Sequence, residues 1–508
     1  MNDFEVVWEP IKNSSQELAI NCPCHHILYE GARGPGKTIT QLMRFRSRVG
    51  LGYGKYWRGV IFDREFDNLA GLVAEAKKWF PKFEDGAEWL ASNSLYKWVW
   101  PTGEELLFRH VKKPEDYDGF HGHEYPFIGW NELTKYPTAD LYDTFMSTNR
   151  SSFSPERDTP RNPDGSYATD DGKPLPPIPL EVFSTTNPSG PGHGWVKLRF
   201  IDVAPRGTVV RHSVEVFNPQ KQANDTVVKT QVAIFGSYRE NIYLSPEYVA
   251  ELERITDENK RRAWLYGDWD VTIGGAFDDL WRSKRHILPR FVIPKNWKID
   301  RSFDWGSTHP FSVGWWAEAN GEEATIVYNG QEFSFCPPAG TLVRFFEWYG
   351  TEKLGTNKGL KLGARAIAEG IKQREDALIE AGWISTRPLP GPADNQIGNV
   401  TESETDTIQK RMSLVGIEWE SSDKSKDSRK IGMELGREML LAVTNGEGRG
   451  LYAMDCCKSF IAIFPHLSRD PIKVDDVDTT TEEHIWDETR YRILKNRTGI
   501  KQITVNMP

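Results

Sequence analysis

The sequence predicts an α/β protein of two domains, with a mainly parallel sheet in the first and a mixed sheet in the second. A glycine-rich loop lies between an apolar strand and a helix near the N-terminus. Apolar strands that end in polar residues then alternate with helices through the first half, which is typical of a parallel sheet. The second half begins with strands typical of an antiparallel meander, over 301–333, followed by a helix over 362–382. A chain of 508 residues is long enough for each half to bury its own core.

The composition is that of an ordinary soluble globular protein, with 38% hydrophobic and 27% charged residues. No apolar run approaches the length that a membrane span requires, so we expect no membrane contact. Five cysteines are too few for a disulfide scaffold in a chain of this size, which favours a reducing compartment. The net charge of −9 argues against non-specific coating of nucleic acid, although a local basic channel can still bind DNA.

The glycine-rich loop, YEGARGPGKT over 29–38, matches the phosphate-binding pattern of Gly31, four residues, Gly36, Lys37 and Thr38. Such a loop points backbone N–H groups at a triphosphate, while the lysine reaches the outer phosphates and the threonine hydroxyl holds Mg²⁺. An apolar strand over 26–29 enters the loop and a helix over 39–49 leaves it. The loop therefore predicts binding of ATP or a relative. The loop residues expected to contact it are Gly31, Arg33, Gly34, Gly36, Lys37 and Thr38.

Gln16 lies in a short helix before the loop. Its amide offers a donor and an acceptor, which suits the edge of an adenine. An exposed glutamine in a capping segment is the alternative interpretation.

The next segments predict a buried strand over 57–64, a helix over 68–80 and a hairpin over 98–109. The strand over 125–130 then ends in the polar pair Asn131 and Glu132. A glutamate at this point can orient and deprotonate an attacking water. Asn131 lacks the negative charge of an aspartate, but its carbonyl oxygen can accept from a metal-bound water.

Residues 151–179 are rich in proline, glycine, aspartate and serine, and predict a long surface excursion. The apolar strand over 180–183 follows and ends in STTNP, which includes Asn187. Hydroxyl and amide groups at this strand end can sense a γ-phosphate, although such a run is also an ordinary turn.

Gln16, the GARGPGKT loop, IGWNE and STTNP, in this order, resemble the large subunit of the terminases of tailed double-stranded DNA phages. The segment 241–275 looks like the helical bridge of that family, and the resemblance extends over nearly the whole chain. It implies a P-loop ATPase domain over 1–240, a helical bridge or linker over 241–294 and a ribonuclease H-like endonuclease domain over 295–508. It also implies an arginine finger, for which Arg33 in the loop and Arg150 after the Glu132 strand are both candidates.

Three acids stand in FDWG, PADN and HIWDETRY, the motifs that match the nuclease half of the family: Asp304, Asp394 and Asp487. Carboxylates gathered from distant segments are what a two-metal phosphodiesterase needs to hold Mg²⁺ or Mn²⁺. Each aspartate alone is an ordinary cap or turn residue.

The third ligand position is open to other acids, because Asp475, Asp476 and Asp478 precede the last helix. The spacing of Thr480 and Glu483 predicts a capping box that opens this helix. His484 and Asp487, three residues apart, should share one face of it.

The resemblance implies a packaging motor that hydrolyses ATP to move double-stranded DNA into a procapsid, and a metal-dependent endonuclease that cuts concatemeric DNA. It further implies a portal protein and a small terminase subunit as partners, a homo-oligomeric ring on the capsid, and action in the host cell cytoplasm rather than in the mature virion. Basic runs at 260–262, 282–285 and 424–430 are candidate DNA-backbone contacts or solvated faces.

Two other functions remain open. A helicase or repair-type ATPase with an appended nuclease would share the phosphate loop, but should carry further strand-separation motifs. A non-catalytic ATP-binding scaffold is supported by Asn131.

Overall fold

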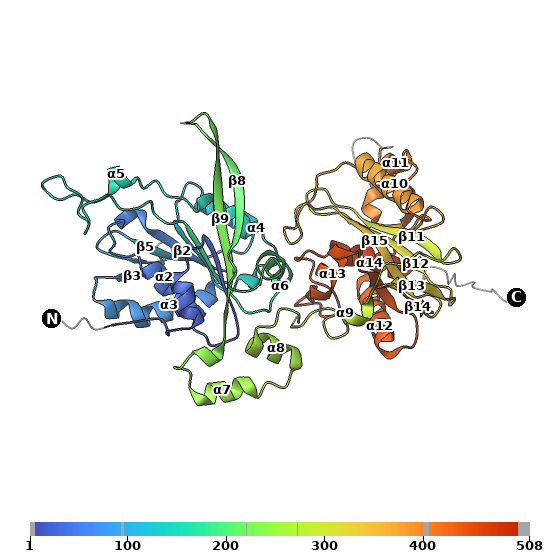
Figure 1. Cartoon of the computed structure of the whole chain (residues 1–508), viewed down its shortest axis with the longest axis horizontal. Coiled ribbons are helices and arrows are strands. Elements are labelled where there is room, and N and C mark those ends of the chain that lie inside the picture. Colours follow the sequence, from blue (N-terminus) through green and yellow to red (C-terminus); the bar gives the residue numbers. More distant parts are fainter. Residues whose placement is uncertain (1–5, 93–95, 220, 272, 400–405, 496–508) are drawn as a thin grey trace. The chain divides into compact units, whose positions relative to one another are not determined.

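The computed structural model describes residues 6–92, 96–219, 221–271, 273–399 and 406–495. The chain divides into two compact units, Met1–Ile273 and Gly274–Pro508 (Figure 1). Their boundary falls inside the segment 241–294 that the resemblance marks as a bridge, so α7 (Pro246–Glu253) and α8 (Glu258–Tyr266) belong to the first unit and α9 (Ser283–His286) to the second.

The first unit is built on one sheet in which β5, β2, β6, β7, β1 and β9 run parallel in that order. Antiparallel strands extend it at both edges. The strands are, in sheet order, β3 (Glu88–Leu90), β4 (Lys97–Val99), β5 (Glu105–His110), β2 (Arg58–Asp63), β6 (Phe127–Trp130), β7 (Glu181–Thr185), β1 (His26–Gly31), β9 (Ala223–Gly236) and β8 (Val210–Asn218).

Helices cover both faces of this sheet, because its parallel strands are apolar on both sides. Ile27 and Tyr29 of β1 pack in the core on one face, while Leu28 packs in the core on the other. The helices are α1 (Ser15–Asn21), α2 (Lys37–Arg46), α3 (Phe66–Trp79), α4 (Asp140–Phe145), α5 (Pro155–Asp158), α6 (His193–Val196), α7 (Pro246–Glu253) and α8 (Glu258–Tyr266). Because six strands of this sheet run parallel, their carboxyl ends meet at one edge of the sheet. The loop after β1 lies at that edge.

The long ribbon of β8 and β9 is the element that the sequence interpretation missed. The carboxyl half of β9 pairs with β1 inside the sheet, whereas most of β8 and the amino half of β9 are exposed. Figure 1 shows the ribbon projecting from the sheet of this unit. Its mixed polar and apolar sequence lacks the apolar run by which the buried strands were identified.

The second unit is built on a mixed sheet. Strands β15, β12 and β11 are antiparallel neighbours, and β16 and β17 continue the sheet parallel to β11. This is the arrangement of the ribonuclease H-like fold that the resemblance implies. The strands are, in sheet order, β10 (Ile287–Leu288), β18 (Leu451–Met454), β15 (Leu342–Tyr349), β12 (Ser312–Glu318), β11 (Lys298–Asp304), β16 (Pro392–Ala393) and β17 (Glu420–Ser421).

Two cores flank this sheet. One packs against α10 and α11, and the other against α12, α13 and α14, with Trp315 and Trp316 of β12 in different cores. The helices are α9 (Ser283–His286), α10 (Ala364–Glu380), α11 (Ile408–Ser413), α12 (Ser428–Asn445), α13 (Lys458–Ile463) and α14 (His484–Leu494). Because α14 packs on β11, its first turn lies beside the carboxyl end of that strand.

Two local predictions for the second unit are wrong. The segment over 325–333 forms a separate hairpin, β13 (Ala324–Tyr328) and β14 (Gln331–Phe335), and β15 is the third strand of the meander. The last helix begins at His484 without a side-chain cap, because Thr480 donates to Asp478 in the preceding turn.

The predicted fold class is confirmed: a mainly parallel sheet in the first unit and a mixed sheet in the second. Among the residues that the structure describes, no helix is long and apolar enough to cross a membrane.

Candidate active sites

The glycine-rich loop connects β1 to α2 and turns in the left-handed region at its glycines. Gly31 has φ 122°, and a Cβ there would come within 2.5 Å of the carbonyl oxygen of Gly236. Gly36 has φ 85° and precedes the first residue of α2. Glycine is needed at these positions because other residues are strained at such φ values. The loop therefore ends at a helix N-terminus, as phosphate binding requires.

Lys37 is buried in the loop and bound by neutral oxygens. Its Nζ donates to the carbonyl oxygen of Ala32 at 2.6 Å and to Oδ1 of Asn187 at 2.8 Å. Burial lowers the pKa of Lys37 to about 8, against the opposing charges of Glu132 and Glu30. A cation that lacks a directly bonded anion in a low-dielectric site favours an anionic ligand.

Glu132 follows β6 at the same sheet edge and has an uncommon backbone conformation, with φ 52°. The amide nitrogen of Asn187 lies 3.5 Å from both of its carboxylate oxygens. Left-handed φ values at non-glycine residues cost energy and are concentrated at functional sites. Lys37, Asn187 and Glu132 thus form one connected group of strand-end and loop side chains.

This group faces an open cavity of about 840 Å³, large enough for a nucleotide. Of the predicted residues, those that line it are Arg33, Gly34, Gly36, Lys37, Thr38, Asn131, Glu132 and Asn187. Gly31 shapes the start of the loop instead.

Asn131 is held by a buried acid that the sequence interpretation missed. Its Nδ2 donates to Oδ2 of Asp63 at 2.7 Å, and its Oδ1 accepts from the hydroxyl of Thr185. Asp63 ends β2, the neighbouring strand, and pairs with Lys135 at 3.0 Å. Asp63 stands at the carboxyl end of an apolar strand, and this position is the feature of the sequence from which its role could have been predicted. The negative charge absent from Asn131 is therefore present one strand away, compensated by Lys135.

Gln16 lies beneath the loop and does not line the cavity. Its Nε2 donates to the carbonyl oxygen of Pro35 at 3.0 Å, and its Oε1 accepts from the backbone N–H of Ile11. The residue is buried and supports the loop, which differs from the exposed glutamine of the alternative interpretation.

The two candidate arginine fingers lie at opposite ends of the parallel strands. Arg33 lines the cavity, with its guanidinium 3.5 Å from the ring centre of Trp264 in α8. Arg150 is exposed and lies beside Gly122 and Glu124, just before the amino end of β6. Arg150 therefore does not face the cavity of its own chain.

In the second unit, the parallel strands bring two predicted acids together. Asp304 ends β11 and Asp394 follows β16, and the register pairs Phe303 with Ala393 immediately before them. Asp487 enters from the first turn of α14. The charges of Asp394 and Asp487 both act on Asp304, so the three acids lie in one neighbourhood.

Asp304 is almost fully buried and is bonded from α14. Nδ1 of His484 lies 3.1 Å from Oδ2, and the hydroxyl of Tyr491 donates to Oδ1 at 3.2 Å. Burial and the two neighbouring carboxylates raise the pKa of Asp304 to about 6, although His484 opposes the shift. Burial lowers the pKa of His484, but its hydrogen bond to Asp304 and the charge there outweigh burial, and the net shift is upward.

A fourth acid, Glu483, belongs to this cluster and was missed. Burial and the charge of Asp487 raise the pKa of Glu483 to about 7, against the attraction of Arg429. Glu483 immediately precedes His484 in the sequence, but only the position at which α14 begins brings its side chain close to the other acids.

Of the three alternative acids for the third position, Asp475 and Asp478 have partners outside the cluster, whereas Asp476 shares Arg429 with Asp487. Asp475 is exposed and pairs with Lys430, Asp476 pairs with Arg429, and Asp478 caps the turn at Thr480.

The donor chemistry of this acid cluster fits Mg²⁺ or Mn²⁺, because these ions prefer oxygen ligands and neutralise gathered carboxylates. The raised pKa of Asp304 indicates that the protein's own cations do not fully neutralise these carboxylates. Within the described ranges, however, no three His, Cys, Asp or Glu side chains are arranged so that they could hold a metal ion as they stand. Lys424 and Arg429 are bonded to the acids instead.

No protein-family model and no curated protein matches the chain. Several solved structures are similar to it, and these are large terminases. That of a thermophilic bacteriophage is 14% identical, over 96% of this chain and 99% of that chain, with a TM-score of 0.37. That of bacteriophage HK97 is 12% identical, over 94% of each chain, with a TM-score of 0.41. The P22 large terminase nuclease domain is 13% identical, over 44% of this chain and 93% of that chain, with a TM-score of 0.30.

At such identities and TM-scores the likeness carries no argument about chemistry. The chemistry of this chain depends on the residues of its two sites.

The pKa of Asp304 predicts a pH-dependent effect on stability. A raised folded-state pKa contributes stability that is full below the unfolded value of about 3.9 and is lost as pH rises through about 6. In metal-free buffer, Asp304→Asn should therefore raise the melting temperature at pH 8, and the gain should shrink toward pH 5. Thermal unfolding across this range measures it.

The exposed Glu322→Gln in the same unit is the matched control and should show no such trend. A melting temperature of Asp304→Asn equal to or below that of the parent at pH 8 would contradict this electrostatic account.

Proposed function

We propose that the chain is a terminase large subunit, the motor that packages double-stranded phage DNA into a procapsid. The first unit hydrolyses ATP to drive translocation, and the second cuts concatemeric DNA. The observation that carries the proposal is the presence of two separate charged sites in one chain. One is a phosphate loop with a buried lysine, and the other is a buried carboxylate cluster on a ribonuclease H-like sheet.

In the first unit, ATP would lie in the cavity beside the loop. The N–H groups at the start of α2 and the Lys37 ammonium bind its phosphates, and Thr38 is placed to hold its Mg²⁺. Asn187, which bonds Lys37 and faces Glu132, is placed to respond to the γ-phosphate. Gln16 acts by holding Pro35, which fixes the loop beneath the nucleotide.

Glu132 is the general base that orients and deprotonates the attacking water. Asn131 positions the strand end through Asp63 and Thr185 instead of carrying charge itself. Arg33 acts on the nucleotide in the cavity of its own subunit, which it lines. Arg150, at the far end of the strands, acts as the arginine finger on the nucleotide of an adjacent subunit in a homo-oligomeric ring.

In the second unit, Asp304, Asp394 and Asp487 would hold the divalent ions. When bound, Mg²⁺ or Mn²⁺ would activate water and stabilise the leaving oxygen of the cut strand. His484 holds Asp304 in place through its hydrogen bond and tunes cutting.

Packaging also depends on molecules other than this chain. We propose that the motor acts on double-stranded DNA at the portal protein of the procapsid, with a small terminase subunit that recruits the DNA. Its place of action is the host cell cytoplasm.

A non-catalytic ATP-binding scaffold is the second candidate, and Asn131 is the observation that favours it. The buried Asp63 one strand away weakens that argument, because the negative charge is retained beside the site. For a helicase or repair-type ATPase, capsid-dependent protection of DNA is the distinguishing assay.

Lys37→Ala should abolish ATP hydrolysis and leave metal-dependent DNA cleavage largely intact. The lysine is buried in the loop of the first unit, whereas the acid cluster lies in the second. Steady-state ATPase and plasmid cleavage assays on the same preparation measure both activities. Lys77→Ala, an exposed lysine on α3, is the control and should change neither. Equal loss of both activities in folded Lys37→Ala would contradict the division of labour.

Glu132→Gln should slow ATP hydrolysis by roughly 10²-fold or more while retaining bound ATP, because it removes the base and keeps the shape of the side chain. Single-turnover hydrolysis and nucleotide retention after rapid gel filtration separate chemistry from binding. Near-normal turnover in this variant would assign the base to another residue.

A further inference from the structure

Arg429, in the first turn of α12, is bound by three carboxylates at the acid cluster. Its Nε donates to Asp476 at 2.7 Å, its Nη1 to Asp487 at 2.8 Å and its Nη2 to Glu483 at 2.7 Å. Each guanidinium nitrogen therefore meets a different acid. This residue belongs to the basic run at 424–430, and its placement fits neither a solvated face nor a free DNA contact.

Lys424, although its side chain is partly exposed, is a second cation of the chain at the same cluster. It follows β17, the strand next to β16, and its Nζ lies 3.2 Å from Oδ1 of Asp394. It also donates to the hydroxyl of Tyr491 at 2.9 Å, and that hydroxyl donates to Asp304. The chain thus places two of its own cations where the acids gather.

The carboxylate of Asp487 is nearly saturated by these contacts. Its Oδ1 accepts from Arg429 at 2.8 Å and from Nη2 and Nε of Arg490 at 3.0 and 3.2 Å. Its Oδ2 accepts from Arg429 at 3.1 Å. A carboxylate offers about four lone-pair positions. Asp487 therefore has little left to offer a metal ion while Arg429 stays in place.

We infer that Arg429 is a built-in counter-ion that closes the acid cluster, and that a divalent metal ion binds in competition with it. The inference rests on the proposed role of the cluster as the metal site. Asp476 and Glu483 hold the guanidinium by its other two nitrogens, so Arg429 can release Asp487 and still remain bonded. The chain's own cations then partly neutralise the cluster until a metal ion binds.

A purely supporting arginine would have the opposite effect on metal affinity. If Arg429 only positioned Asp487 for the metal, its removal would misplace a ligand and weaken metal binding. If it competes with the metal, its removal frees a carboxylate and strengthens binding. The sign of the change in affinity therefore separates the two roles.

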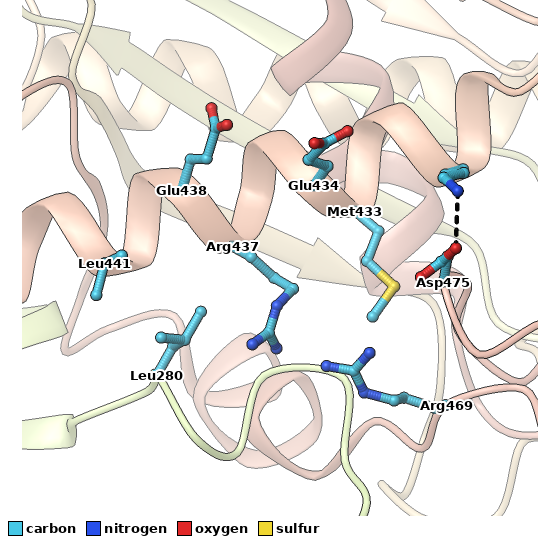
Figure 2. A pocket seen from close by; sticks show the side chains of 9 residues that line it. Leu280, Met433, Glu434, Arg437, Glu438, Leu441, Arg469 and Asp475 are labelled. Carbon is cyan, nitrogen blue, oxygen red and sulfur yellow. Dashed lines mark ion pairs between the residues drawn. The ribbon is translucent and has the colours of Figure 1, made fainter.

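Lys430, the next residue, supplies a matched control. It pairs with Asp475 at 2.8 Å, and both side chains are exposed. Figure 2 shows this ion pair as a dashed line at Asp475, beside a hollow of about 460 Å³ along α12 that is also lined by Met433, Arg437 and Arg469. Lys430 has a charge and helix position similar to those of Arg429 but lies outside the acid cluster.

The test is Mn²⁺ binding by isothermal titration calorimetry on the full chain, without nucleotide or DNA. Arg429→Gln should bind Mn²⁺ at least about tenfold more tightly than the parent, on the scale of changes in the groups around metal ligands. Lys430→Gln should bind as the parent does. Arg429→Lys, which keeps one charge but cannot span three acids, should lie between, and it decides the matter if Arg429→Gln does not fold.

Unchanged or weaker Mn²⁺ binding in the folded Arg429 variants would overturn the inference. Asp304→Asn distinguishes this from failure of the proposed function. If the parent binds Mn²⁺ and Asp304→Asn does not, the metal site stands and only the competition is refuted. If no variant alters Mn²⁺ binding, the cluster is not the metal site and both proposals fail.

Discussion

The cost of burying charge governs both sites of this chain. Lys37 is buried against neutral oxygens, and burial lowers its pKa to about 8. Asp304 is buried against like charges, and its pKa rises to about 6. Neither charge is fully compensated by the protein around it, which costs stability unless a ligand of opposite sign arrives. The first site therefore calls for an anion and the second for a cation, as expected for a triphosphate and a divalent metal ion.

Strand direction explains how both sites are assembled. In the first unit, β1, β6 and β7 run parallel, so the glycine-rich loop, Glu132 and Asn187 meet at one edge. In the second unit, β11 and β16 run parallel, which sets Asp304 beside Asp394 although 90 residues separate them in sequence. The same rule brings the segment after β17, with Lys424, to that edge. Each unit thus gathers chemistry at the carboxyl ends of its parallel strands.

Sequence patterns predicted those parts of the fold and sites that depend on neighbouring residues or lie at the end of a strand. The loop pattern and the polar residues after apolar strands predicted the fold class and eight of the nineteen residues that line the cavity beside the loop. The sequence was insufficient where a residue's role depends on a distant partner. Asp63 matters through Asn131, and Glu483 through Arg429, and no spacing rule connects these pairs. Gln16 is near the predicted site, but only the folded loop shows that it bonds Pro35.

The central claim, that one chain joins an ATP-driven DNA motor to a nuclease, is tested most directly by packaging. Purified chain, procapsids with portal, small subunit and linear double-stranded DNA are incubated with ATP, and DNA protected from added nuclease is then measured. The account predicts protection that requires procapsids and ATP hydrolysis and disappears with a non-hydrolysable ATP analogue. ATP hydrolysis and DNA cleavage by the purified chain without any protected DNA, under conditions in which the procapsids are competent, would contradict it.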